Sequence, residues 1–234
     1  MAEKKLVVIA GVGPGTGASL VEKFKSEGWQ VAMLSRNEVN YAHLADSASG
    51  CRGYRCDVTS EDEVKSVFSA IHREMGDVDA LVFNAGNGVF GSIDDITPQQ
   101  FEDTWRVNAL GSLLCSKSVI PAMKAKKDGA IIFIGATASR RGGPMTAAFA
   151  PAKAAQRSLA ESMARTLWPV GIHVSLIVVD GFIDTPSIRE MMPDKDDEFF
   201  IRPDSLASTA FCLAIQEKSA WTFETEARPF KENW

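Results

Sequence analysis

Short, continuously apolar segments recur along the chain and predict buried β-strands. They are Leu6–Ala10, Val31–Leu34, Ala80–Phe83, Ala130–Ile134 and Val174–Val179. Apolar residues follow one another in these segments with few interruptions, which is typical of strands that are covered on both faces of a sheet. We expect a further short strand at Gly53–Cys56 and a last one at Ala220–Phe223.

Longer amphipathic segments lie between these runs and predict helices. They span about 17–27, 60–75, 98–125 and 149–168, with a late helix at 204–216. Ser60 and Glu63 have the spacing of a capping box, and Thr97 places Pro98 at a first helical position. The alternation predicts an α/β fold: a single-domain, Rossmann-like, doubly wound parallel sheet of about seven strands with helices on both faces.

The sequence shows no internal boundary between domains. No repeat or linker divides the sequence, so we expect one domain over residues 1–234. The polar segment 183–202 is interpreted as a mobile flap near the carboxyl ends of the strands, and a plain solvated loop is the alternative.

Composition and charge narrow the choice of partners. The chain is 45% hydrophobic and 24% charged, as in ordinary globular proteins, and its net charge is -5 without a Lys/Arg block. We therefore expect no nucleic acid and no membrane as partner. The first apolar run is too short for a signal peptide or a membrane span. Four cysteines and three histidines show no metal-binding spacing, so we expect no metal site, reduced core cysteines and a cytoplasmic location.

A glycine-rich turn directly follows the first predicted strand. Its residues are Gly11, Val12, Gly13, Pro14, Gly15, Thr16 and Gly17, and a helix comes next. A pyrophosphate needs close backbone approach and free N–H groups at a helix amino end, and both are expected here. Residues 13–18 match GxGxxG/A in its required strand–turn–helix context, which indicates dinucleotide binding. A turn that only packs is the alternative.

The end of the second predicted strand carries the expected reader of the cofactor ribose. Ser35 stands where a protein that prefers NAD carries an acidic residue. Arg36 follows at once and suits a 2′-phosphate, which favours NADP(H) over NAD(H). The alternative is a solvated arginine whose charge Glu38 reduces.

The glycine spacing resembles the TGxxxGxG fingerprint of the short-chain dehydrogenase/reductase superfamily. Gly11, Gly15 and Gly17 match it, whereas Ala10 takes the Thr position and Thr16 takes the usual aliphatic position. The similarity extends over about residues 6–186 through the segments Asp57-Val58, Asn84-Ala85-Gly86, Asn108, Gly129–Ile134, Gly171–Val174, and Asp180-Gly181 with Thr185 downstream. The resemblance implies that Asp57-Val58 contacts adenine, that Asn84-Ala85-Gly86 lines the cofactor site, and that Gly181 and Thr185 lie near the nicotinamide.

The catalytic positions of the family are only half retained. The resemblance implies a Ser that polarises the substrate oxygen, a Tyr that passes the proton, a Lys that lowers the pKa of that phenol and holds the nicotinamide ribose, and an Asn that anchors a water relay. Here Ala136 and Phe149 occupy the Ser and Tyr positions, while Lys153 and Asn108 remain. The i, i+4 spacing still places Phe149 and Lys153 on one helix face. Phe149 is interpreted as an apolar wall that shapes a pocket or simply packs.

Substitutes for the missing groups are few. The only tyrosines are Tyr41 and Tyr54, both before the fourth strand. Thr137, Ser139 and Thr146 lie near the site and are candidates to polarise a carbonyl. Lys153 is the candidate proton donor if burial lowers its pKa. Loss of a positioned general acid lowers a rate by ~10²–10⁴.

Three functions are compatible with this pattern. The first is an NADP(H)-linked oxidoreductase that acts on a small carbonyl or alcohol by an altered proton route. The second is a catalytically inactive NAD(P)-binding relative that senses cofactor or binds a partner. The third, a purely structural subunit, is disfavoured because the glycine turn, Asn84 and Lys153 are retained. The chain resembles a divergent branch of the superfamily with Phe for Tyr, and family resemblance implies a homodimer or homotetramer formed through the helices at 98–125 and 149–168.

Overall fold

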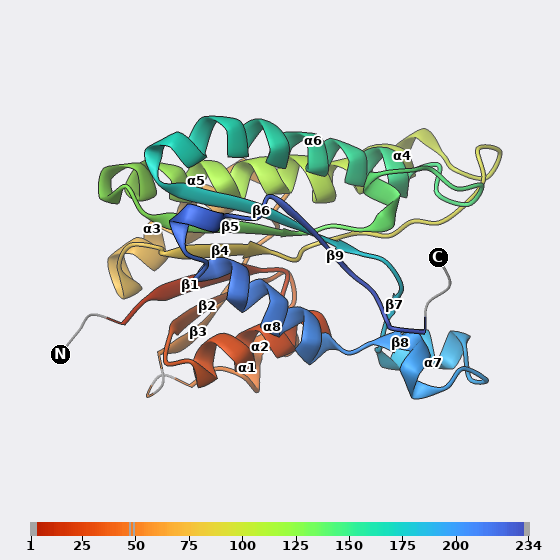
Figure 1. Cartoon of the computed structure of the whole chain (residues 1–234), viewed down its shortest axis with the longest axis horizontal. Helices are drawn as coiled ribbons and strands as arrows, with labels where there is room; N and C mark the ends of the chain where they lie inside the picture. Colours follow the sequence, from red (N-terminus) through yellow and green to blue (C-terminus); the bar gives the residue numbers. More distant parts are fainter. Residues whose placement is uncertain (1–3, 47, 49, 232–234) are drawn as a thin grey trace.

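A seven-stranded parallel sheet forms the centre of the molecule (Figure 1). The computed structural model describes residues 4–46, 48 and 50–231. The sheet has the order β3-β2-β1-β4-β5-β6-β9. Its strands are β1 (Leu6–Ala10), β2 (Gln30–Ser35), β3 (Cys51–Arg55), β4 (Ala80–Phe83), β5 (Gly129–Ile134), β6 (Ile172–Val179) and β9 (Glu224–Ala227). The predicted doubly wound α/β fold is therefore confirmed, and the strand order reverses between β1 and β4.

Helices cover both faces of this sheet. On one face lie α1 (Thr16–Ser26), the short α2 (Val39–Ala42) and α8 (Pro203–Ala214); on the other lie α3 (Glu61–Met75), α5 (Gly111–Lys126) and α6 (Phe149–Leu167) (Figure 1). Each face has its own hydrophobic core. Leu6, Val8 and Leu81 point into the core beneath α3, α5 and α6, whereas Val7 and Ile9 point into the core beneath α1 and α8. Residues on both sides of β1, β2, β4, β5 and β6 are thus buried, which explains their unbroken apolar runs.

The long helix expected at 98–125 has a break within it. It begins as α4 (Pro98–Trp105), passes through a π-helical turn at Arg106–Leu110, and continues as α5. The start is closed by a full capping box in which Thr97 and Gln100 each accept a backbone N–H of the other. Ser60 caps α3 through the N–H of Glu63, but the Glu63 carboxylate accepts from the N–H of Asp57, so that box is only half formed.

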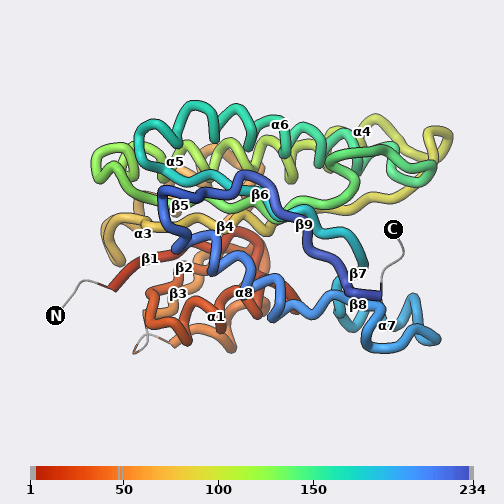
Figure 2. Tube along the Cα trace, viewed as in Figure 1, coloured from red at the N-terminus to blue at the C-terminus, as the bar shows by residue number. Residues whose placement is uncertain are grey.

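The last strand begins later than predicted. Residues 218–220 form a 3₁₀ turn, and β9 starts at Glu224, so the expectation of a strand at Ala220–Phe223 is wrong. Gln216 explains the delay, because its side-chain oxygen accepts the N–H of Thr222 at 2.8 Å and its carbonyl accepts the indole N–H of Trp221 at 3.1 Å. These bonds divert the backbone before it reaches β6. The tube view shows the strand then running beside β6 (Figure 2).

The segment 183–202 has defined structure and is not a plain loop. It contains the end of β7 (Phe182–Ile183), α7 (Pro186–Met191), a 3₁₀ turn at Asp197–Phe199 and β8 (Phe200–Ile201), which pairs with β7. Arg189 holds the segment together by bonding Asp184 at 2.6 Å and Asp197 at 2.9 Å. Its role as a mobile flap stays a prediction.

The cysteines follow the expectation only in part. Cys51, Cys56 and Cys115 are buried and reduced, whereas Cys212 is exposed on the outer face of α8. Cys212 lies between the buried residues Phe211 and Leu213, so the helical period turns it toward solvent. Among the described residues there is no group of three or more His, Cys, Asp or Glu that fits a metal ion. Nor does any helix in that part of the chain have the length and apolar character to cross a membrane.

The packing of α8 on α1 gives a direct test of this architecture. Phe211 of α8 contacts Phe24 and Trp29 edge to face, with ring centroids 5.3 and 6.2 Å away. We expect Phe211→Ala to lower the free energy of unfolding by about 3 kcal/mol through lost burial and a residual cavity. The neighbouring Cys212→Ala is the matched control and should change it by less than about 0.5 kcal/mol. Urea denaturation measures both, and equal effects would contradict the packing described.

Candidate active site

A cavity of ≈ 330 Å³ lies at the carboxyl ends of β1, β2 and β4. Residues expected to bind cofactor form most of its wall: Gly11, Gly13, Ser35, Arg36, Asp57, Val58, Asn84, Ala85 and Gly86. The wall also contains residues that sequence reasoning missed: Val12, Leu34, Asn37, Asn40, Cys56 and Val107. Its position at the reversal of strand order is where open α/β sheets bind their ligands.

The glycines of the turn after β1 serve different purposes. Gly11 has a φ of +96°, and a Cβ there would lie 2.3 Å from the backbone nitrogen of Ala85. Gly17 is needed for packing, since a Cβ would lie 2.7 Å from the carbonyl oxygen of Gly11. A Cβ on Gly13 would meet nothing within 4 Å, although Gly13 lines the cavity. The packing alternative therefore accounts for Gly11 and Gly17, but not for the open backbone at Gly13.

The end of β4 is bonded to this turn. Asn84 donates its side-chain amide to the Gly11 carbonyl at 2.7 Å, and its backbone N–H bonds Ala10 at 2.8 Å. Asn84 thereby holds the two strand ends together on the cavity side. Thr16, which is buried, begins α1 directly behind the turn.

The end of β2 presents polar groups to the other side of the cavity. The buried Ser35 hydroxyl accepts the side-chain amide of Asn40 at 2.9 Å, so Asn40 joins the predicted pair. Arg36 is exposed at the rim. At the end of β3, the Asp57 carboxylate accepts two bonds from Thr59 and shapes the turn into α3, while Val58 packs against Gly111.

Thr185 and Gly181 lie apart from the cavity wall. Thr185 caps α7, and a Cβ placed on Gly15 would lie 2.8 Å from its methyl group, so the segment after β7 rests on the glycine turn. Gly181 has a φ of +145° and packs against Pro229 of the tail. Neither contact tests a role toward nicotinamide, so these roles stay predictions.

The two residues predicted to occupy the Tyr and Ser positions are both apolar. Phe149 is half-buried at the start of α6, and its ring packs against Phe90 with centroids 5.2 Å apart. Ala136 precedes the 3₁₀ turn at Thr137–Ser139. The two tyrosines lie elsewhere. The Tyr41 ring packs on Gly53 of β3, and Tyr54 donates its hydroxyl to Glu74.

Lys153 is a buried amine with uncharged partners. Its side chain lies one turn after Phe149 and is 5% exposed. Nζ donates to the Ile134 carbonyl at 2.9 Å and to the Gln156 side-chain oxygen at 3.0 Å. Burial penalises the charged form and lowers the pKa of Lys153 to about 8. Lys153 therefore has the lowered pKa that a lysine proton donor requires.

Asn108 has a buried acceptor without a partner. It lies in the π-helical turn, where its amide donates to the carbonyls of Asn87 at 3.0 Å and Thr104 at 2.9 Å. Within the described chain, its Oδ1 has no hydrogen bond. A Cβ on Gly86 would lie 3.4 Å from this oxygen and 3.9 Å from Lys153 Nζ. Both polar atoms thus approach the same cavity-lining residue, which fits a site that holds a polar ligand.

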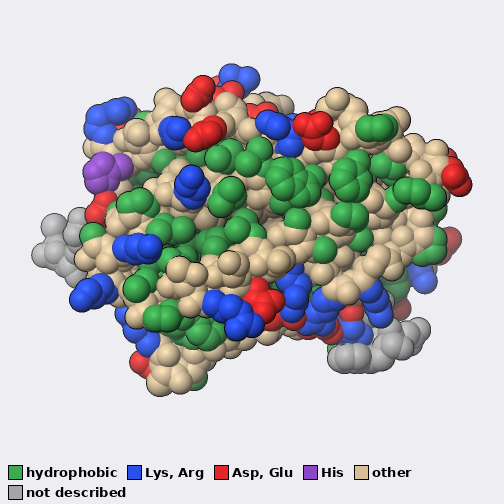
Figure 3. Space-filling model, turned by 90° about the horizontal axis from the view of Figure 1, so that it is seen from above, with side chains coloured by type: hydrophobic (Ala, Val, Ile, Leu, Met, Phe, Trp, Pro, Cys, Tyr) green, Lys and Arg blue, Asp and Glu red, His purple; other side chains and the backbone are tan. Residues whose placement is uncertain are grey.

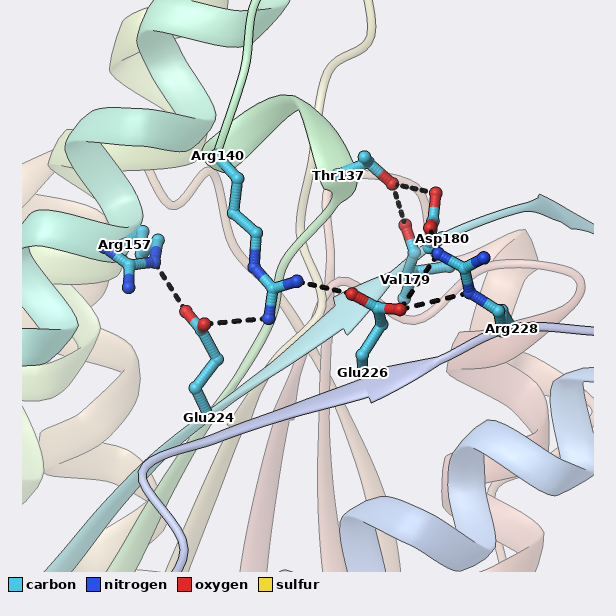
Figure 4. Close-up of polar contacts among 8 residues, drawn as sticks. All are labelled: Thr137, Arg140, Arg157, Val179, Asp180, Glu224, Glu226 and Arg228. Carbon is cyan, nitrogen blue, oxygen red and sulfur yellow. Dashed lines mark hydrogen bonds and ion pairs between the residues drawn. The ribbon is translucent and has the colours of Figure 1, made fainter. Parts of the chain in front are cut away.

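Hydroxyls near the Ser position are turned toward the protein. Thr137 donates to Asp180 at 2.5 Å and to the Val179 carbonyl at 3.2 Å (Figure 4). Thr146 bonds the backbone of Gly143. The buried Ser139 hydroxyl has no partner among the described residues. The hydroxyl proton of Thr137 is therefore bonded to the end of β6, and that of Thr146 to the backbone of Gly143.

An ion-pair network fixes the segment from Thr137 to Arg140 to the sheet edge (Figure 4). Its links run from Arg157 of α6 to Glu224, from Glu224 to Arg140, from Arg140 to Glu226, from Glu226 to Arg228 and from Arg228 to Asp180. Asp180 in turn accepts from Thr137. The network joins α6, β9 and the end of β6. Sequence reasoning missed it because most partners are far apart in the chain.

Comparisons with known proteins agree with the fold and the cavity, which together define a dinucleotide-binding α/β protein of Rossmann type. The family model for short chain dehydrogenase matches residues 5–196. D-xylose 1-dehydrogenase of Caulobacter vibrioides is 34% identical over 230 residues, covering 93% of this chain and 91% of that protein.

Solved structures give the same result. A short-chain dehydrogenase from Rhodopseudomonas palustris is 33% identical with a TM-score of 0.82, covering 97% of this chain and 99% of that one. A Tyr-to-Phe variant of ElxO with NADPH bound is 23% identical with a TM-score of 0.87, covering 95% of this chain and 96% of that one. The chain belongs to the short-chain dehydrogenase family of oxidoreductases.

The pKa of Lys153 predicts how stability changes with pH. Because the folded-state pKa lies below the unfolded value of about 10.4, the unfolded chain binds more protons between pH 8 and 10. Stability from this group therefore rises with pH in that range. We expect the free energy of unfolding of the wild type to gain roughly 2–3 kcal/mol over Lys153→Met between about pH 7 and pH 10. Urea denaturation at each pH measures this difference, and parallel profiles would contradict it.

Proposed function

We propose that this protein is an NADP(H)-linked oxidoreductase that acts on a small carbonyl or alcohol, with Lys153 in place of a tyrosine as the group that handles the proton. The proposal rests on a cavity whose wall contains part of the glycine turn and Gly86, with a buried amine of lowered pKa next to Gly86 and beside the Phe149 ring. Family membership supports the reaction class, and one relative, D-xylose 1-dehydrogenase of C. vibrioides, is named as a dehydrogenase.

The cofactor part of the proposal rests on the wall of the cavity. The open backbone at Gly13 and the amino end of α1 suit a pyrophosphate. Ser35 with Asn40 offers hydrogen bonds to a ribose, and Arg36 at the rim offers a cation to a 2′-phosphate. When bound, NADPH supplies the hydride. The NADPH-bound Tyr-to-Phe variant of ElxO supports the view that this fold holds the cofactor with such a replacement.

The proton part rests on Lys153. At neutral pH its amine is mostly protonated, yet its pKa of about 8 lies much closer to neutrality than that of an exposed lysine. A group with such a pKa donates and accepts protons efficiently. Two of its N–H groups bond Ile134 and Gln156, and Nζ lies 3.9 Å from where a Cβ on Gly86 would stand. The Phe149 ring lies beside the amine, with its centroid 5.9 Å from Nζ, and cannot ionise.

The alternative function is a catalytically inactive relative that senses cofactor or binds a partner. Ala136 and Phe149 favour it, because neither supplies the hydrogen bonds that a substrate oxygen needs. The committed hydroxyl of Thr137 adds to this argument. Both functions require the cofactor cavity, so turnover discriminates between them.

We also propose a homodimer or homotetramer formed through the layer of α4, α5 and α6. Hydrophobic side chains gather on this side of the molecule (Figure 3). Phe101, Trp105 and Leu113, which belong to α4 and α5, are 38–42% exposed. Apolar surface of this kind is typical of protein interfaces.

Arg36 provides the test of cofactor preference. The wild type should bind NADPH more tightly than NADH, and Arg36→Ala should weaken NADPH binding by about tenfold, since one charge-assisted contact is lost. NADH binding should not change. Arg55→Ala, at the end of the neighbouring β3 and outside the cavity wall, is the matched control. Nicotinamide fluorescence titration measures all affinities, and equal wild-type affinities for the two cofactors would remove Arg36 from its role.

Restoration of the family residues tests the proton route. The double change Ala136→Ser with Phe149→Tyr should raise carbonyl reduction by roughly 10²–10⁴, the usual contribution of a positioned acid. The rates are measured by monitoring NADPH oxidation during the reduction of a panel of carbonyl compounds. Wild-type turnover as high as that of the variant would contradict the loss of the acid. Wild-type turnover that is absent throughout, with NADPH still bound, would favour the inactive relative.

A further inference from the structure

A chain of buried polar side chains leads from Lys153 into the helix layer. Lys153 Nζ donates to Gln156 Oε1 at 3.0 Å, and Gln156 Nε2 donates to Ser112 Oγ at 3.0 Å. Ser112 then donates its hydroxyl to the carbonyl of Asn108 at 2.6 Å. Gln156 and Ser112 are both fully buried, and neither was singled out from the sequence. The chain connects Lys153 to Asn108, the two retained family residues.

The direction of this chain is fixed by its last bond. The Ser112 hydroxyl has one proton, and the Asn108 carbonyl, which can only accept, takes it. Ser112 Oγ must therefore accept from Gln156, which directs the NH₂ group of that amide toward Ser112. The Gln156 oxygen consequently faces Lys153, where only a donor is present. A flipped amide would place donor against donor at Lys153 and leave buried groups unsatisfied.

We propose that Gln156 is a positioning residue that holds the Lys153 amine between the Ile134 carbonyl and Gly86 and sets how readily that amine keeps its proton. This inference rests on the proposed role of Lys153 in proton handling. A hydrogen bond from the ammonium form to the Gln156 oxygen favours the charged state, which burial alone disfavours. Gln156 thus keeps the buried lysine able to carry a proton, although no carboxylate accompanies it.

The surroundings of Lys153 leave Gln156 as the adjustable partner. Ile134 of β5 contributes only its backbone carbonyl, Phe149 of α6 is apolar, and Gly86 has no side chain. Asn108 of the π-helical turn presents a neutral amide. Burial lowers the pKa of Lys153, and no charged or titratable side chain among the described residues contributes to this shift. A change at Gln156 therefore acts on the amine without a competing charge.

The test is a direct titration of Lys153 in the full-length protein without cofactor or substrate. Lysine labelled with ¹³C at Cε is followed by NMR over pH, and the Lys153 signal is assigned by its loss in Lys153→Met. Gln156→Glu should raise the pKa of Lys153 by about one unit or more, since an opposite charge favours the ammonium form. Gln156→Leu should lower it, because an acceptor is lost.

Two serine variants test the direction of the chain. Ser112→Ala removes the acceptor of the Gln156 amide and should lower the Lys153 pKa in the same direction as Gln156→Leu, by a smaller amount. Ser116→Ala is the matched control. Ser116 is equally buried and donates to the Ser112 carbonyl at 2.7 Å, but it is not part of the series of side-chain hydrogen bonds that links Lys153 to Asn108. It should leave the titration unchanged. Should Gln156→Leu fail to fold, Gln156→Glu and Ser112→Ala still decide the question.

The outcomes separate this inference from the proposed function. Lys153 pKa values that stay at the wild-type value in Gln156→Glu and Ser112→Ala would overturn the role of Gln156, whatever the turnover. Shifted values in a protein that reduces no carbonyl would support Gln156 and overturn the proposed reaction. Equal shifts in Ser112→Ala and Ser116→Ala would show general loosening of the helix layer and would also overturn the inference.

Discussion

The close approach of the carboxyl ends of β1 and β4 is the constraint on which the rest of the structure depends. A side chain at Gly11 would lie 2.3 Å from the backbone of Ala85, and Asn84 bonds the Gly11 carbonyl across the same gap. Because the strand order reverses here, the chain leaves these two strands toward opposite faces of the sheet. The cavity exists between the departing segments, and Gly13 and Gly86 are free to meet a ligand at its wall.

A buried lysine amine lies beside this cavity. Lys153 and Asn108 both lie next to Gly86, and the ring of Phe149 lies beside the Lys153 amine, 5.9 Å from Nζ to the ring centroid. An amine that is buried without a counter-ion is costly, and the protein limits the cost with neutral acceptors from β5 and α6. The result is a lysine whose pKa lies near the physiological range. That property suits proton transfer, and it would not arise if a carboxylate stood in place of Gln156.

The fold could be predicted from local pattern because β1, β2, β4, β5 and β6 are almost entirely buried, and because capping residues mark the starts of α3 and α4. The glycine turn, Ser35, Arg36, Asp57 and the Asn84–Gly86 segment could also be found locally, because they lie at or just after the ends of strands. Contacts between segments that are distant in the sequence could not be predicted from local pattern. Gln156 and Ser112 are 44 residues apart, and Thr137 and Asp180 are 43 apart, so nothing local marks either pair. The late start of β9 likewise depends on side-chain bonds from Gln216.

We propose that this protein keeps a dinucleotide-binding turn while the apolar ring of Phe149 occupies the position of the family's proton donor. A crystal structure of the wild-type protein grown with NADPH tests it most directly. We expect the pyrophosphate at the Gly11–Gly17 turn, the nicotinamide beside Phe149, and the Lys153 amine as the nearest ionisable group. Density for NADPH elsewhere, or another ionisable side chain in front of the Phe149 ring, would contradict it.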